Sequence, residues 1–168
     1  MARRCEAGPV RPTLTRQAII EEARRTIVAE GLEALSLRRI AANLEVTAPA
    51  LYAYLTDKSD LLRAVAEGEL AVLITRFEAV DDIDPVARDE SYCRAYIDHA
   101  RENPELYPVM FLFPPDFAPG APEGAEIPMA TRAFTISSEA VAEAIESGQF
   151  RDLDPLQAHM RRPRFAVG

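Results

Sequence analysis

Two short apolar stretches, separated by a polar break, lie between residues 35 and 62, which read LSLRRIAANLEVTAPALYAYLTDKSDLL. The first stretch has apolar side chains at positions i, i+3, i+4 and i+7, namely Leu37, Ile40, Ala41 and Leu44. This spacing places them on one face of a short α-helix. Ser36 precedes that face, and its hydroxyl can accept a hydrogen bond from an otherwise unpaired helix N–H. A short helix is therefore predicted to begin directly after Ser36.

A second short helix is predicted after the break at residues 43–46. Thr47 is its expected cap, and Pro49 suits its first turn, because an N–H there would have no partner inside the helix. Leu51 and Leu55 form an apolar stripe that can pack against the first helix. Two short helices joined by a tight turn, the second opening with small and hydroxyl side chains, are typical of a helix-turn-helix.

The pattern of this stretch is specific in many positions at once, which are Ser36, Arg38, Ile40, Ala41, Leu44, Val46, Pro49, Leu51, Tyr52, Lys58, Leu61 and Leu62. The upstream segment agrees in the same register through Arg16, Ile19, Ile20, Ala23 and Gly31. Together these residues resemble the DNA-binding domain of the tetracycline-repressor (TetR) family of bacterial transcriptional regulators. The resemblance covers roughly residues 1–75.

The rest of the chain predicts an all-α protein without a strand pattern or internal repeat. Its further helices are expected at residues 13–30, 57–80, 85–102, 104–112, 128–147 and from 154 onward. Seven of the thirteen prolines fall between Pro104 and Pro128, so residues 113–127 are predicted to be an irregular loop. Residues 1–62 would form an N-terminal arm and a three-helix DNA-binding domain, and residues 63–168 a helical effector-binding and dimerisation domain.

The formal net charge of -8 is unevenly distributed along the chain. Residues 1–62 hold nine Lys and Arg against eight Asp and Glu, whereas residues 63–168 hold ten against nineteen. The acidic excess therefore lies outside the expected DNA-binding domain and does not exclude DNA as a partner. A basic face within that domain would draw on Arg3, Arg4, Arg11, Arg16, Arg38, Arg39 and Lys58.

The resemblance implies contacts with double-stranded operator DNA for eight residues. The positions that would face the major groove are Thr47, Ala48, Pro49, Ala50 and Tyr54. Tyr52 and Lys58 would hold phosphates, and Arg38 would reach a guanine. The alternatives are that the two tyrosines pack on the first helix and that Lys58 is an ordinary surface lysine.

Four residues predict that this head makes few direct contacts with DNA bases. Ala48, Ala50 and Ala53 are too short to hydrogen-bond a base, so Arg38 and Tyr54 would carry most of the direct polar readout. Glu45 stands where the family usually has glycine, and it needs a backbone angle that glycine adopts more easily. Either the turn differs here, or a carboxylate close to the DNA backbone lowers non-specific affinity.

The second half of the chain contains all seven phenylalanines, together with Met110 and several tyrosines. In the family this half binds a small effector, and an apolar cavity for it would need aromatic and methionine side chains. The expected lining residues are Phe77, Tyr92, Tyr96, Tyr107, Met110, Phe111 and Phe134. The alternative for any one of them is an ordinary place in the core.

Several other classes of protein are disfavoured. No run of apolar residues approaches the ~20 needed for a membrane helix, and the N-terminus lacks the apolar core of a secretory signal, so a cytoplasmic protein without a membrane partner is expected. Cys5 and Cys93 form neither a disulfide framework nor a metal site, and both are expected to be free thiols. No nucleophile, metal-ligand or paired-carboxylate motif predicts an enzyme, and no cofactor is expected.

Members of the family normally continue with two long helices that form a four-helix dimer interface, and this chain ends where the first should be under way. A homodimer is thus implied by the resemblance alone. The sequence predicts a transcriptional regulator, most simply a repressor that a small apolar effector releases from its operator. The alternative is a ligand- or partner-binding helical protein with a degenerate DNA-binding head.

Overall fold

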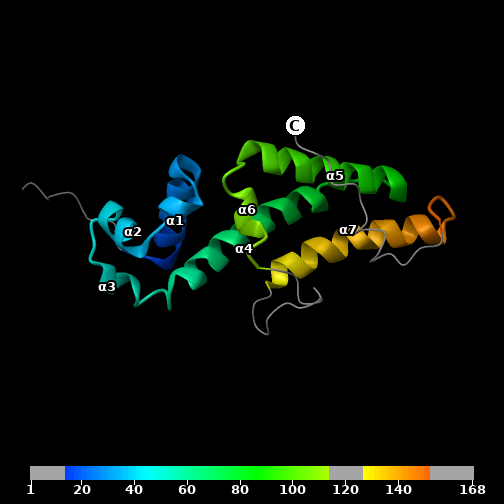
Figure 1. The fold of residues 1–168 in the computed structure, drawn as a ribbon. Coiled ribbons are helices and arrows are strands. Elements are labelled where there is room, and N and C mark those ends of the chain that lie inside the picture. The colour runs from blue at the N-terminus through cyan, green and yellow to red at the C-terminus, as the bar shows by residue number, and fades with distance from the viewer. Residues whose placement is uncertain (1–13, 114–126, 152–168) are drawn as a thin grey trace, which may run out of the picture.

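The computed structural model describes residues 14–113 and 127–151, and every regular element within them is a helix. The molecule is elongated, with a small helical head at one end and a bundle of longer helices at the other (Figure 1). We call residues 14–62 the head, and residues 63–113 and 127–151 the body. The all-α fold predicted from the sequence is confirmed.

Three helices make up most of the head: α1 (Arg16–Glu30), α2 (Leu37–Asn43) and α3 (Ala48–Leu51), with a single 3-10 turn at Leu32–Ala34. α1 begins after Thr15, whose hydroxyl accepts a hydrogen bond from the N–H of Ala18 at 3.1 Å. It ends at Gly31, which has φ +82° and donates its N–H to the C=O of Ile27 at 2.8 Å. The apolar side chains Ile19, Ala23 and Ile27 of this helix are completely buried.

The body is built on α4 (Lys58–Glu78), which leaves the head and crosses into the bundle (Figure 1). α5 (Pro85–Glu102) and α7 (Pro128–Glu146) pack on α4 and on each other, and the short α6 (Tyr107–Met110) packs on α4. The boundary expected after residue 62 falls inside α4, so one rigid helix belongs to both parts.

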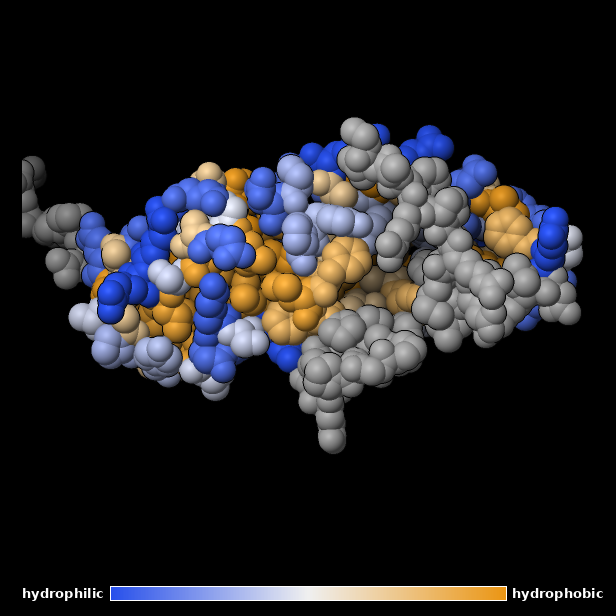
Figure 2. Space-filling model, viewed as in Figure 1, coloured by the Kyte–Doolittle hydropathy of each residue, from blue (hydrophilic) through white to orange (hydrophobic). Residues whose placement is uncertain are grey.

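A continuous apolar core joins the head to the body. It runs from Ile19 and Leu51 in the head through Leu61, Leu73 and Phe77 along α4. Figure 2 shows hydrophobic side chains gathered near the middle of the molecule, where the head meets the body, with hydrophilic side chains toward the tip of the head. The head is therefore packed against the body through α4 and does not hang on a linker.

Most predicted helix ends agree with the structure, and two helix starts do not, since α1 begins at Arg16 and not at residue 13. Asp57 and Asp84 cap α4 and α5 by accepting the N–H groups of Asp60 and Ala87. The helix expected from Pro104 begins only at Tyr107, because the N–H of Leu106 donates to the C=O of Asn103 and forms a separate turn first. The N-terminal arm, most of the proline-rich loop and the helix expected from residue 154 lie outside the described residues.

Candidate nucleic-acid interface

The turn between α2 and α3 is closed by backbone hydrogen bonds around one left-handed residue. The N–H of Val46 donates to the C=O of Ala41 at 2.9 Å, and the N–H of Glu45 donates to the C=O of Ala42 at 3.1 Å. Glu45 has φ +55°, in the left-handed region that glycine adopts without steric cost. Glu45 therefore has the backbone angle expected of this position, and its side chain is exposed.

α3 turns one side to the core and the other to solvent. Leu51 and Leu55 are buried in the head, whereas Thr47 and Pro49 are exposed, and Ala48 and Ala50 are half-buried. The two tyrosines that follow also face outward: Tyr52 has 57% of its surface exposed and Tyr54 has 37%. Neither tyrosine is buried against α1, so both are available at the surface that α3 presents.

A latch made by Arg16 and Asp60 holds the segment between α3 and α4. The Arg16 guanidinium donates to both carboxylate oxygens of Asp60, at 2.8 and 3.3 Å, and to the C=O of Tyr54 at 2.6 Å. Asp60 also accepts the N–H of Thr56 at 3.0 Å. The hydrogen bonds from Arg16 lower the pKa of the Asp60 carboxyl to about 2. The latch thus fixes the chain on either side of Tyr54.

Four of the six Lys and Arg side chains in the described part of the head are held in ion pairs. Besides Arg16 with Asp60, these pairs are Arg24 with Glu69, Arg25 with Glu22, and Arg39 with Glu30. Arg38 and Lys58 form no ion pair with any residue that the structure describes. The basic face predicted for the head therefore reduces to these two cations, because Arg16 and Arg39 are already neutralised and Arg3, Arg4 and Arg11 lie outside the described residues.

Lys58 occupies an electrostatically unfavourable place. It is the first residue of α4, where the unpaired N–H groups of the helix carry partial positive charge. This partial charge repels a cation such as the Lys58 side chain, whereas it attracts a phosphate. Arg38 lies near the start of α2, so the two unpaired cations come from the helices on either side of α3.

The residues predicted to line an effector pocket fall into two groups. Phe77 and Tyr92 are in contact with ring centroids 4.9 Å apart and ring planes tilted by 40°. Tyr96, Tyr107 and Phe111 form a second aromatic cluster. The ring centroid of Tyr107 lies 5.9 Å from that of Tyr96 and 4.9 Å from that of Phe111. Met110 is buried in the core, and Phe134 is half-buried on α7.

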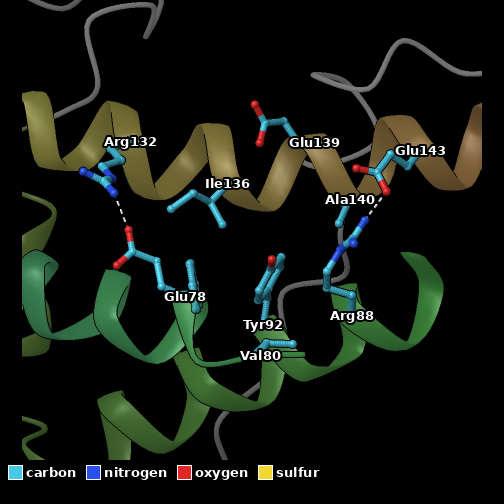
Figure 3. A pocket seen from close by; sticks show the side chains of 10 residues that line it. Glu78, Val80, Arg88, Tyr92, Arg132, Ile136, Glu139, Ala140 and Glu143 are labelled. Carbon is cyan, nitrogen blue, oxygen red and sulfur yellow. Dashed lines mark hydrogen bonds and ion pairs between the residues drawn. The ribbon is translucent and has the colours of Figure 1, made fainter. Parts of the chain in front are cut away.

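The first aromatic pair lies in a cleft between α4, α5 and α7 (Figure 3). The cleft has a volume of about 370 Å³, and its lining residues are Phe77, Glu78, Val80, Arg88, Tyr92, Arg132, Ile136, Glu139, Ala140 and Glu143. The second cluster does not contribute to this cleft. Five of its polar or charged lining residues were absent from the expected set, since single charges on a helix surface carry no local signal that they will face a cleft.

Head and body are also joined by a buried charged group that the sequence analysis missed. Glu69 of α4 is only 3% exposed, and one of its carboxylate oxygens accepts from Nε of Arg24 on α1 at 2.6 Å. Its other oxygen lies 3.6 Å from Nε2 of His99 on α5. Burial lowers the pKa of His99, which is 4% exposed. Glu69 therefore ties a head helix and a body helix to the same point of α4.

The described residues hold no group of His, Cys, Asp and Glu placed to bind a metal ion. In the same part of the chain, no helix has the length and apolar character needed to cross a bilayer.

Two family models match the chain at the two parts defined above. One is described as bacterial regulatory proteins of the tetR family and matches residues 19–65. The other is described as a tetracyclin repressor-like C-terminal domain and matches residues 90–165. The chain belongs to the tetR family. Both the DNA-binding head and the helical body of a TetR protein are thus represented.

Relatives of this TetR chain agree with that assignment. The HTH-type transcriptional repressor DrrR1 of Streptomyces coeruleorubidus is 47% identical over 60 residues, which is 36% of this chain and 22% of that repressor. The match thus spans about a fifth of the repressor's own length. A protein of unknown function from Rhodococcus sp. RHA1 superposes with a TM-score of 0.73 at 25% identity, covering 92% of this chain and 79% of that one.

A structure of BioQ with its natural double-stranded DNA operator has the same fold. It superposes with a TM-score of 0.65 at 21% identity, covering 88% of this TetR chain and 78% of BioQ.

Proposed function

We propose that this TetR chain is a DNA-binding transcriptional regulator, most simply a repressor, whose head lays α3 in the major groove of a double-stranded operator. The observation that carries the proposal is the pair of unpaired cations, Arg38 and Lys58, beside an exposed α3 in a head whose other described cations are neutralised. A basic side chain without a protein partner can exchange its hydration for a phosphate or a base edge without breaking an ion pair.

The roles of the residues follow from their chemistry and placement. Arg38 is proposed to make a bidentate contact with guanine, and Tyr54 to supply the remaining polar contact with the bases. The exposed Pro49 and the half-buried Ala48 and Ala50 of α3 are proposed to meet thymine methyl groups, with Thr47 at the start of the helix. Tyr52 and Lys58 are proposed to hold phosphates, since an anion at the N-terminus of α4 would also offset the helix dipole.

The body is proposed to regulate the head. In this proposal residues 1–62 bind DNA and residues 63–168 bind a small effector and a second copy of the chain. A homodimer would present two heads ~34 to 36 Å apart to a pseudo-palindromic operator in the cytoplasm. An effector releases DNA only if it binds the DNA-incompetent arrangement more tightly than the competent one. The proposed activity is binding, without catalysis.

The proposal is tested by fluorescence anisotropy with a labelled duplex from directly upstream of the gene, at two or more salt concentrations. Specific binding should resist excess unrelated duplex and weaken steeply with salt, with a slope of about -0.9 per phosphate contacted. Lys58→Ala should reduce that slope by about one contact and weaken all sequences alike. Arg38→Ala should cost about 1 to 3 kcal/mol on the operator and relax its sequence preference.

Arg94→Ala is the matched control, because Arg94 is an exposed cation of α5 far along the chain from the head. It should leave binding unchanged. If Arg94→Ala weakens duplex binding as much as Lys58→Ala does, the attraction is a general charge effect and the assigned interface is wrong. Sedimentation velocity of the same samples measures whether a dimer co-sediments with the duplex.

A second function is favoured by the composition of the reading surface. Glu45 places a carboxylate in the turn before α3, and Ala48, Ala50 and Ala53 offer no hydrogen bonds to bases. These features fit a ligand- or partner-binding protein with a degenerate head. That function is supported if the chain ignores every duplex but retains a ligand in the body.

A further inference from the structure

The cleft between α4, α5 and α7 has an apolar floor and is closed at both ends by ion pairs (Figure 3). Arg132 of α7 pairs with Glu78 of α4 at one end, and Arg88 of α5 pairs with Glu143 of α7 at the other. Phe77 and Tyr92 both line the cleft with their rings in tilted contact, and Tyr92 lies between the two ion pairs. Its volume of about 370 Å³ falls within the range of small-molecule sites.

Tyr92 carries a polar group into this cleft. Only 8% of its surface is exposed, and its hydroxyl end points from α5 toward α7 in Figure 3. The hydroxyl makes no hydrogen bond with any residue in the described part of the chain. Burial raises the pKa of Tyr92, so the hydroxyl is protonated at neutral pH and its oxygen can accept a hydrogen bond. A hydroxyl that faces the cleft without a hydrogen-bond partner in the described part of the chain can bind a ligand's polar group.

The charges around the cleft favour a positive ligand. Two arginines and three glutamates line it, and both arginines are already paired. Glu139 of α7 is a lining residue one turn before Glu143, and it has no ion pair with a described residue. Two carboxylates at this spacing repel each other. Residues 63–168 also carry nineteen acidic against ten basic residues, so the field of the body attracts cations.

We propose that this cleft binds a hydrophobic amine in its protonated form, with the ammonium group donating to the Tyr92 hydroxyl beside the glutamates of α7 and the apolar part covering Phe77 and Ile136. Aromatic rings add attraction for a cation near their faces. An organic anion would instead have to displace Glu143 from Arg88, or Glu78 from Arg132, against the negative field of the body. The anion is therefore the disfavoured occupant.

Three probes with the same phenylpropyl skeleton separate these occupants: 3-phenylpropylamine, 3-phenylpropanol and 3-phenylpropionate. Their binding to the full chain is measured by titration calorimetry at neutral pH and low salt. The amine should bind about tenfold more tightly than the alcohol, and the carboxylate should bind most weakly. Equal binding of amine and alcohol, tighter binding of the carboxylate, or no binding of the amine at millimolar concentration would each overturn the proposal.

Variants locate the binding within the cleft. Glu139→Gln should weaken binding of the amine severalfold and leave binding of the alcohol unchanged, because it removes one charge and keeps the side-chain shape. Tyr92→Phe keeps the ring on Phe77 and should weaken binding of the amine more than binding of the alcohol, because both can donate to the hydroxyl but only the amine does so with a charged group. The matched control is Glu90→Gln, an equal change of charge at an exposed α5 residue outside the cleft. If Glu90→Gln weakens the amine as much as Glu139→Gln, the amine is attracted by net charge and the cleft is not its site.

Binding of the amine is independent of DNA, but its role as the releasing effector rests on the proposed function. Adding the amine to the protein–duplex complex separates the two. If the amine releases the duplex from the parent protein but not from Glu139→Gln, both the amine site and its role as the releasing effector are supported. An amine that binds the cleft while the duplex stays bound leaves the site intact and contradicts effector release by this ligand. A protein that binds the amine but never a duplex leaves the site intact and contradicts the proposed regulator.

Discussion

Asp60→Asn should destabilise the protein, because it removes the charge that Arg16 binds at the start of α4. Arg16 and Asp60 are 44 residues apart and join α1 to α4 through two side-chain hydrogen bonds. The asparagine keeps one oxygen that can accept the N–H of Thr56. The substitution therefore weakens the latch without creating a cavity.

The size of the effect follows from the lowered pKa of Asp60. A decrease from 3.8 to about 2 corresponds to about 2 kcal/mol if none of it is screened. The Arg16 side chain is 45% exposed and that of Asp60 is 23% exposed, so solvent reduces this value. We expect a loss of about 1 kcal/mol in the free energy of unfolding, which for a chain of this size lowers Tm by about 2 to 4 °C.

The pH dependence gives the sign of the effect independently. The folded-state pKa lies below the unfolded one, so the stabilisation is fully present above about pH 4 and is lost as pH falls toward 2. Urea unfolding at several pH values should show a constant difference between Asp60→Asn and the parent at pH 5 to 7. That difference should shrink below pH 4.

Asp98→Asn is the control, since Asp98 forms an exposed pair with Arg101 at 3.9 Å and should contribute at most about 0.5 kcal/mol. An Asp60→Asn loss no larger than that of the control, or one that is unchanged down to pH 2.5, would refute the reasoning.

Three further predictions concern the turn, the long helix and the buried histidine. Glu45→Gly should stabilise the protein by about 0.5 to 1 kcal/mol in urea unfolding, because it relieves a left-handed residue; Glu45→Ala keeps the Cβ, and an equal gain there would contradict this reason. Gly68→Ala should raise the free energy of unfolding by about 0.5 to 1 kcal/mol, since a Cβ there meets nothing within 4 Å; a lower Tm would show that α4 must bend at this position. Burial lowers the pKa of His99, so the stability that its neutral form contributes is present above the unfolded value of 6.5 and is lost as pH falls below it. His99→Gln should therefore lose less stability than the parent between pH 7.5 and 5.5, and parallel curves would refute a role for His99 in that loss.

The ends of the helices were predictable because the groups that set them are neighbours in the sequence. A cap such as Ser36 accepts the N–H of Arg39 three residues later, and Gly31 and Gly148 end helices with positive φ angles. The start of α6 was mispredicted for a related reason. Asn103 and Pro104 form a turn as readily as a helix start, and the choice depends on how Leu106, which is 1% exposed, packs in the core.

The candidate interface was predictable in its location but not in its charges. The positions in α2, α3 and α4 followed from the family pattern. In the structure Ala48 and Ala50 are half-buried, and the others are exposed, namely Arg38, Thr47, Pro49, Tyr52, Tyr54 and Lys58. Which cations are free followed only from tertiary pairing, because Arg24 and Arg38 look alike in the sequence, yet one meets a carboxylate 45 residues away and the other meets none in the described part.

The sequence alone therefore determined the helical class, the helix-turn-helix and most helix limits, because these depend on side-chain periodicity and on hydrogen bonds that span a few residues. The tertiary structure decided the Arg16–Asp60 latch, the contacts of Glu69 with Arg24 and His99, and the division of the aromatic residues between two clusters. Each of these joins residues of different helices. Local patterns say which face of a helix is apolar, but only the packing of α1, α4, α5 and α7 decides which charged and aromatic side chains meet.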